Sequence, residues 1–110
     1  MARTSISYQQ VVRTGLTESL AAANADGHKF SNDGRIILHV VNGGASPITV
    51  TIQTPGTVDD LAVSDRTVTI SDEAEKIIGP FPPGIYNQSD GMVYVDFSAV
   101  TSVTVSALRV

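Results

Sequence analysis

Two histidines, His28 and His39, supply the only imidazole groups of the chain, which contains no cysteine. General acid–base and nucleophilic catalysis usually depend on an imidazole or a thiolate, because few other side chains exchange protons near neutral pH. None of the eleven serines lies in the Gly-x-Ser-x-Gly motif that presents a nucleophile on a sharp turn. His39 stands in the apolar run Arg35–Val41, where an imidazole is usually hydrogen-bonded within or beside a core. We therefore expect structural histidines, no catalytic residue and no enzyme activity.

Oxygen-rich segments raise the question of a calcium site. Residues 24–34 contain several Asn, Asp and Ser side chains, but an EF-hand loop also needs a bidentate glutamate at its twelfth position. Frames that start at residue 24 or 26 place Arg35 or Ile37 there. Asp26 and Asp33 are better explained by Asx turns, in which the side chain accepts a hydrogen bond from the backbone two residues on.

A second acidic group consists of Asp59, Asp60 and Asp65. These carboxylates suit a hard cation, but a solvated loop that keeps a sheet edge from pairing with another sheet explains them with fewer assumptions. We predict no metal, no cofactor and no cofactor-binding residue.

Two shorter motifs are also explained without a ligand. Pro80 and Pro83 have the Pro-x-x-Pro spacing of SH3 ligands, but Lys76 is the only basic residue nearby, so we predict a rigid strap between two sheets. The segment Asn87–Ser89 matches an N-glycosylation acceptor, which we set aside because no signal peptide is recognisable.

Composition limits the class of partner. Seven Lys and Arg residues against eleven Asp and Glu give a formal charge of −4 and a pI near 4.8, so the chain lacks the positive field that nucleic-acid binding requires. No stretch approaches the roughly 18 apolar residues that span a bilayer. We expect a soluble protein with neither a nucleic-acid nor a membrane partner.

The elements that must position these residues are strands. Valine, threonine and isoleucine number 14, 11 and 9, against five leucines and two lysines, which favours sheet. Alternation and turn residues predict strands at residues 35–41, 48–53, 61–63, 66–71, 76–78, 92–97 and 103–108, with turns at the dipeptides Asp26-Gly27, Asp33-Gly34, Asn42-Gly43 and Asp90-Gly91. Residues 35–41 and 48–53 should form one hairpin, and residues 66–71 and 76–78 should form another.

This spacing predicts an all-β fold, a single-domain antiparallel β-sandwich of jelly-roll or immunoglobulin type with seven to eight short strands. Residues 1–17 show no sustained period and are interpreted as an N-terminal arm that ends in a turn, followed by the sandwich domain over residues 18–110. Residues 20–23 fit half a helix by propensity, but a short strand or an irregular edge fits equally well.

Four segments together, Leu20–Gly34, Leu38–Gly44, Ile48–Ile52 and Gly84–Asn87, resemble the small virion proteins of tailed bacteriophages, and most of all the capsid decoration (cement) proteins. The resemblance covers most of residues 16–110. It implies a β-sandwich that forms homo-oligomers, often trimers, on the capsid surface of the virion after synthesis in the host cytoplasm. It also implies that the major capsid protein is the partner and that neighbouring capsid subunits are clamped together. It transfers no catalytic or ligand residue to this chain.

Our hypothesis from the residues is that the arm Ala2–Thr17 and a sheet edge contact the capsid, while faces rich in Thr and Ser stay hydrated. One alternative is a head–tail joining or tail structural protein with the same fold. Another is a carbohydrate- or receptor-binding module, for which Tyr86 and Tyr94 would be the platforms.

Overall fold

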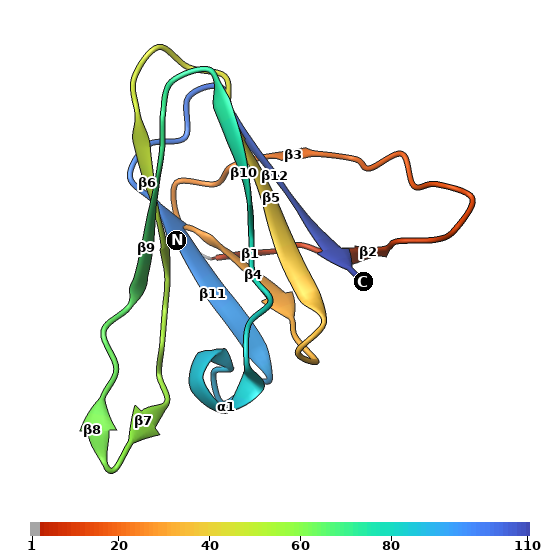
Figure 1. Cartoon of the computed structure of the whole chain (residues 1–110). Coiled ribbons are helices and arrows are strands. Elements are labelled where there is room, and N and C mark those ends of the chain that lie inside the picture. Colours follow the sequence, from red (N-terminus) through yellow and green to blue (C-terminus); the bar gives the residue numbers. More distant parts are fainter. Residues whose placement is uncertain (1–2) are drawn as a thin grey trace.

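The computed structural model describes residues 3–110, which form a sandwich of two five-stranded sheets (Figure 1). In sheet A the strands lie in the order β1 (Thr4–Ser5), β4 (His28–Ser31), β11 (Met92–Phe97), β6 (Ile48–Ile52) and β9 (Arg66–Ile70). In sheet B the order is β10 (Ala74–Ile78), β5 (Ile36–Asn42), β12 (Val103–Arg109) and β2 (Tyr8–Gln10), and β3 (Ala21–Ala22) also pairs with β12. The predicted all-β sandwich is confirmed.

A separate two-stranded sheet and one short helix complete the described chain. Strands β7 (Thr57–Val58) and β8 (Leu61–Ala62) pair with each other, and α1 (Pro83–Tyr86) lies between β10 and β11. Strands β4 and β7 and helix α1 were not predicted. Strand β4 lies within the segment that the sequence analysis considered for its oxygen ligands. Its two inward residues are His28 and Phe30, and a polar inward residue hides the alternation of apolar and polar residues.

The core lies between the inner faces of the two sheets, and strict alternation along the strands fills it. In β5 every second residue is buried, and β6 follows the same pattern with its threonines on the outer face. At one end, Phe81 packs against Phe30 and Tyr86 at ring-centroid distances of 5.7 and 5.3 Å. The fully buried large side chains are Phe30, Ile36, Leu38, Val40, Val50, Ile52, Ile70, Phe81, Val93, Val95, Val103 and Val105.

Both predicted hairpins are wrong. Strand β5 pairs with β10 and β12, whereas β6 pairs with β9 and β11 in the other sheet. Likewise β9 belongs to sheet A and β10 to sheet B. Residues 43–47 and 71–73 therefore cross the roughly 10 Å between two packed sheets, rather than joining neighbouring strands. Alternation identifies the face of a strand that is buried, but not the strand beside it.

The Gly79–Pro83 segment behaves as the predicted strap, since it leads from β10 in sheet B to β11 in sheet A. It ends in a helical turn that the sequence analysis did not anticipate. Pro83 occupies the first turn of α1, where the missing N–H of proline costs no helical hydrogen bond.

Residues 4–10 of the predicted arm are strands of the sandwich. Strand β1 pairs in parallel with β4, and β2 pairs in parallel with β12, so the sheets are not wholly antiparallel as predicted. Arg3 fixes the start of this segment: Nη1 donates to Val95 O at 3.0 Å and to Asp96 Oδ1 at 2.7 Å. Gly27 lies against the Arg3 side chain and has a φ of 87°. A Cβ atom at this position would lie 2.8 Å from Val95 O, so only glycine fits here.

Asn42, the last residue of β5, holds together the two loops that cross between the sheets. Its side chain is 1% exposed, and Nδ2 donates to the carbonyl oxygens of Ser46, Ile70 and Ser71 at 2.9 to 3.2 Å. Its Oδ1 accepts from Gly44 N at 3.0 Å. The glycines of the other three predicted turns have positive φ. The Asn42-Gly43 dipeptide differs, because Asn42 ends strand β5 and binds both loops that cross between the sheets.

We predict that Asn42→Ala lowers the free energy of unfolding by about 1–3 kcal/mol, because it leaves buried backbone groups without their partner. Urea denaturation followed by circular dichroism measures the change. Asp72→Ala, at an exposed position of the second crossing turn, is the matched control and should change stability by less than about 0.5 kcal/mol. Equal effects of the two substitutions would contradict the role given to Asn42.

Candidate functional site

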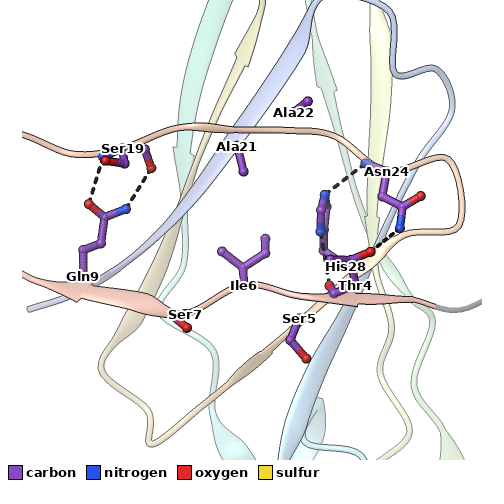
Figure 2. Close-up of a pocket in the computed structure, with 10 residues that line it drawn as sticks. All are labelled: Thr4, Ser5, Ile6, Ser7, Gln9, Ser19, Ala21, Ala22, Asn24 and His28. Carbon is purple, nitrogen blue, oxygen red and sulfur yellow. Dashed lines mark hydrogen bonds between the residues drawn. The ribbon is translucent and has the colours of Figure 1, made fainter.

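A groove of about 530 Å³ lies between the N-terminal segment and β3 (Figure 2). Side chains bridge the two strands at both ends of the groove. At one end Gln9 pairs with the backbone of Ser19, donating to its carbonyl oxygen at 2.8 Å and accepting from its N–H at 2.9 Å. At the other end His28 and Asn24 reach across, while Ile6 points into the space between. Side-chain hydrogen bonds, rather than a β-ladder, therefore join the two segments across the groove.

His28 is the titratable side chain among the residues that line this groove, and both its ring nitrogens are engaged. Nδ1 lies 3.2 Å from Thr4 O, and Nε2 accepts from Asn24 N at 3.0 Å, which assigns the neutral tautomer with the proton on Nδ1. The side chain is 3% exposed, and burial lowers the pKa of His28 below its ordinary value of 6.5. This imidazole supports the fold by joining β1 and β4 to the segment after β3.

His39 belongs to a cluster on the outer face of sheet B. It is paired in register with Ser106 across β5 and β12, and Glu18 from the loop between β2 and β3 folds over both. Glu18 Oε1 contacts His39 Nδ1, and Glu18 Oε2 accepts from Ser106 Oγ at 2.6 Å. The carboxylate therefore lies between the imidazole and the hydroxyl, and Ser106 is completely buried. In a catalytic triad the imidazole must lie between the other two groups, so this arrangement cannot activate the serine.

A metal does not fit this cluster either. The Nε2 atom of His39 lies 3.2 Å from Glu75 Oε1 but makes no hydrogen bond within residues 3–110. Glu18 and Glu75 approach opposite nitrogens of the ring, so their oxygens do not converge on one point. In the described part of the chain, no group of three or more His, Asp or Glu side chains is placed to hold a metal ion.

Sequence analysis missed Glu18, although a signal for it exists. It is the only acidic residue in the first 25, and it is the least exposed residue in the stretch 11–20. An isolated carboxylate in a segment otherwise made of apolar and neutral polar residues is a candidate for a specific internal contact.

Of the two aspartates weighed as calcium ligands, Asp33 forms the predicted Asx turn and Asp26 does not. Asp33 Oδ1 accepts from Arg35 N in an Asx turn, and its Oδ2 accepts from Arg109 Nε at 2.7 Å, which lowers the pKa of that carboxyl. In the neighbouring turn Asn24, rather than Asp26, is the Asx residue, because its Oδ1 accepts from Asp26 N.

The second acidic group forms the tip and the base of the β7–β8 hairpin. Asp59 and Asp60 are its two turn residues, with φ of 53° and 62°. Asp65 accepts from the N–H of Thr54 at 3.0 Å and from its hydroxyl at 3.1 Å, closing the base. The three carboxylates therefore do not converge as a cation site, in line with the predicted solvated loop.

The remaining motifs are also engaged within the fold. The Pro80–Pro83 strap carries the buried Phe81, and Asn87 exchanges hydrogen bonds with Asn32. The ring of Tyr86 packs on Phe81. The Arg3 guanidinium covers the ring of Tyr94 at 4.7 Å. Each tyrosine ring thus already has a partner within the fold.

The hydroxyl group of Tyr94 also has a partner within the fold. Tyr94 Oη donates to Asp90 Oδ2 at 2.9 Å, which lowers the pKa of the Asp90 carboxyl and raises the pKa of Tyr94.

Exposed apolar side chains gather on two loops that extend away from the sandwich (Figure 1). The first, residues 11–20, is named the β2–β3 loop, and it exposes Val11, Val12, Leu16 and Leu20. The second is the β7–β8 hairpin, with Val58 56% and Leu61 70% exposed. The sequence hypothesis included residues 11–17 of the first surface in a contacting arm but missed the hairpin, because an apolar residue in a short irregular segment carries no periodic signal.

No protein family matches the chain, and neither curated proteins nor solved structures give a match. Within residues 3–110, no helical segment has the length and apolar character needed to cross a bilayer. The surfaces of the molecule are therefore the remaining guide to function.

We predict that His28 makes the wild type less stable as the pH drops below 6.5. Burial lowers the folded-state pKa of His28, so the unfolded chain binds this proton more readily and acidification favours unfolding. His28→Gln cannot take up a proton and should lack this part of the decline. Denaturation midpoints at about pH 8 and about pH 5 measure it. His39→Gln retains His28 and is the control; an identical decline in wild type and His28→Gln would refute the assignment.

We further predict that Glu18→Ala lowers the free energy of unfolding by about 1–3 kcal/mol, since it leaves the buried Ser106 hydroxyl without its acceptor. Hydrogen exchange should accelerate over residues 11–20, because Glu18 fixes this loop to sheet B. Glu75→Ala removes a 63% exposed carboxylate on the other side of His39 and should cost less than about 1 kcal/mol. Unchanged exchange in the loop of Glu18→Ala would show that Glu18 does not anchor it.

Proposed function

We propose that the chain is a structural protein of a tailed-phage virion, which binds the outside of the capsid and stabilises it by bridging capsid subunits. The single observation that carries this proposal is the pair of apolar loops projecting from different parts of one rigid sandwich. A molecule with two separate contact surfaces can touch two neighbours at once, which bridging requires. The resemblance of four segments to capsid decoration proteins supplies the choice of particle.

Weak contacts suffice for such a role on a repeating lattice. Each loop exposes only a few apolar side chains, fewer than the roughly 20–30 residues per side of a stable isolated interface. When many copies bind one particle, each copy is held by several neighbours, and avidity rises without any single strong site. Small exposed loops on a stable sandwich are suited to this kind of assembly.

The proposed contact is narrower than the arm Ala2–Thr17 of the sequence hypothesis. Residues 4–10 form strands in both sheets, so deleting the arm would remove β1 and β2 along with any contact surface. The exposed apolar part begins at Val11, after β2, and substitution of single side chains there tests contact without removing a strand.

The carbohydrate-binding alternative is less well supported by the geometry, because Phe81 and Arg3 pack on the rings of Tyr86 and Tyr94. A head–tail joining or tail protein fits the same surfaces and differs in copy number. Closed rings at a phage neck hold about six or twelve copies, whereas a decoration protein is present on the order of hundreds per particle.

We predict that Val11→Ser combined with Val12→Ser weakens binding to undecorated capsids of the encoding phage by roughly tenfold, which corresponds to about 1.4 kcal/mol of lost apolar contact. Co-sedimentation followed by quantitative mass spectrometry gives both affinity and copy number. Ile77→Ser removes a 66% exposed apolar side chain from β10, away from both loops, and should bind like wild type. Wild-type binding by the loop variant, or a copy number near six or twelve, would overturn the proposal.

A further inference from the structure

The two projecting loops lie at opposite lateral edges of the sandwich. The β7–β8 hairpin extends the β6–β9 pair, and β9 is the outer strand of sheet A beside β10, the outer strand of sheet B. The β2–β3 loop joins two strands that both pair with the same side of β12, at the far edge of sheet B. Figure 1 shows the hairpin (green) and the loop (red to orange) pointing away from each other. One copy therefore cannot bring its own two loops together.

The chemistry of the two loops is complementary. The hairpin presents two aspartates at its tip, Asp59 and Asp60, flanked by the exposed Val58 and Leu61. No other charged residue occurs between residues 54 and 64. Its surface is therefore an acidic tip with apolar sides.

The β2–β3 loop has the opposite charge on a similar apolar surface. Arg13 is exposed and lies between Val12 and Leu16. Glu18, the other charged residue of this loop, is turned inward onto Ser106 and His39. The outward charge of the loop is therefore positive, in a protein whose net charge is −4.

Both surfaces are held at their bases by contacts within the chain. The hairpin is closed by backbone pairing of β7 with β8 and by Thr54 with Asp65 at its base. The loop is fixed at its roots by the Val11 N to Arg109 O hydrogen bond of 2.9 Å, by Gln9 with Ser19, and by Glu18. Ordered surfaces lose less conformational entropy on binding, so a small contact can be productive.

We propose that the β7–β8 hairpin of one copy of this chain binds the β2–β3 loop of a second copy, with Asp59 and Asp60 beside Arg13 and the flanking apolar side chains packed together. The proposal rests on the proposed virion role, and it names a further copy of the chain, in place of a capsid subunit, as the neighbour that each loop touches. Linked copies bind the particle together, so damage to either loop also lowers the avidity for capsids. Such a contact joins two different surfaces, so it is heterologous, and copies linked head to tail close into a ring when the rotation between them allows it.

Two defective variants test the pairing. Val58→Ser with Leu61→Ser damages the hairpin only, and Val11→Ser with Val12→Ser damages the loop only. Wild type should form oligomers in sedimentation velocity at up to about 1 mM chain, the weak limit of specific association, whereas each variant alone should be a monomer. Mixed in equal amounts, the variants should form a one-to-one dimer, because each retains the surface that the other lacks. Ile77→Ser, with both loops intact, should assemble like wild type.

Charge supplies a second readout. Asp59→Asn with Asp60→Asn removes the negative tip while keeping residues that tolerate positive φ, and it should weaken assembly severalfold. It should also reduce the dependence of assembly on salt, since a contact between opposite charges is screened by ions. Thermal unfolding of each variant at the wild-type temperature confirms that the sandwich is intact.

A monomeric wild type, a mixture that stays monomeric, or a hairpin variant that assembles alone would each overturn the pairing. The outcomes for the two proposals are distinct. If the chain is monomeric in solution but decorates capsids through its loops, the loops contact capsid subunits directly and only the pairing is wrong. If the chain assembles as described but is absent from particles, the pairing stands and the virion role is wrong.

Discussion

The shared core between the two sheets is the constraint on which the rest of the structure depends. Each sheet has one apolar face, and neither face can be buried except against the other. Most connections of the described chain therefore cross from one sheet to the other, including those after β4, β5, β9, β10 and β11. Two connections do not cross: the β2–β3 loop returns to the same side of β12, and the β7–β8 hairpin joins β6 to β9 within sheet A. These are the two segments that project from the sandwich.

There is a physical reason why the connections that stay within one sheet are also the ones that expose apolar side chains. A connection that crosses spans the end of the core, so its side chains meet both sheets, as the Asn42 amide does when it binds the carbonyl groups of both crossing loops. A connection within one sheet has no such surface to cover, and its apolar side chains stay exposed unless another molecule covers them. The topology thus places one set of exposed apolar residues in each of these two segments, whereas Tyr8, Ile77 and Val110 are exposed elsewhere.

Residues 3–10 show how short strands are kept in the sheets. Strand β1 has only two ladder residues, which is too few to hold a chain segment by backbone hydrogen bonds alone. Side chains add the missing contacts: Arg3 reaches Asp96, and His28 joins Thr4 to Asn24. Arg109 binds Gln10 and Asp33 at the opposite end. The sequence hypothesis of a free arm failed because these contacts join residues up to 99 positions apart, which no local pattern reveals.

Alternation allowed the strands and their buried faces to be predicted. Ile48, Val50 and Ile52 face inward as expected, and β5 is an interior strand because both of its faces are largely apolar. The identity of neighbouring strands could not be predicted in the same way, since a loop of five residues serves equally for a hairpin and for a crossing. Glu18, His39 and Ser106 meet only because a loop folds over sheet B, so the isolated position of Glu18 in the sequence does not reveal which residues it contacts.

Two aspartates form the turn of the β7–β8 hairpin. Both Asp59 and Asp60 have positive φ, a region that Asp and Asn enter more readily than other residues with a side chain. Asn-Gly forms the same two-residue turn with much less strain. Leu61 beside it is 70% exposed and adds little to the stability of the fold. The hairpin therefore combines a turn that two aspartates fit with exposed apolar residues on either side, and the proposed contact with a second copy of the chain uses this combination.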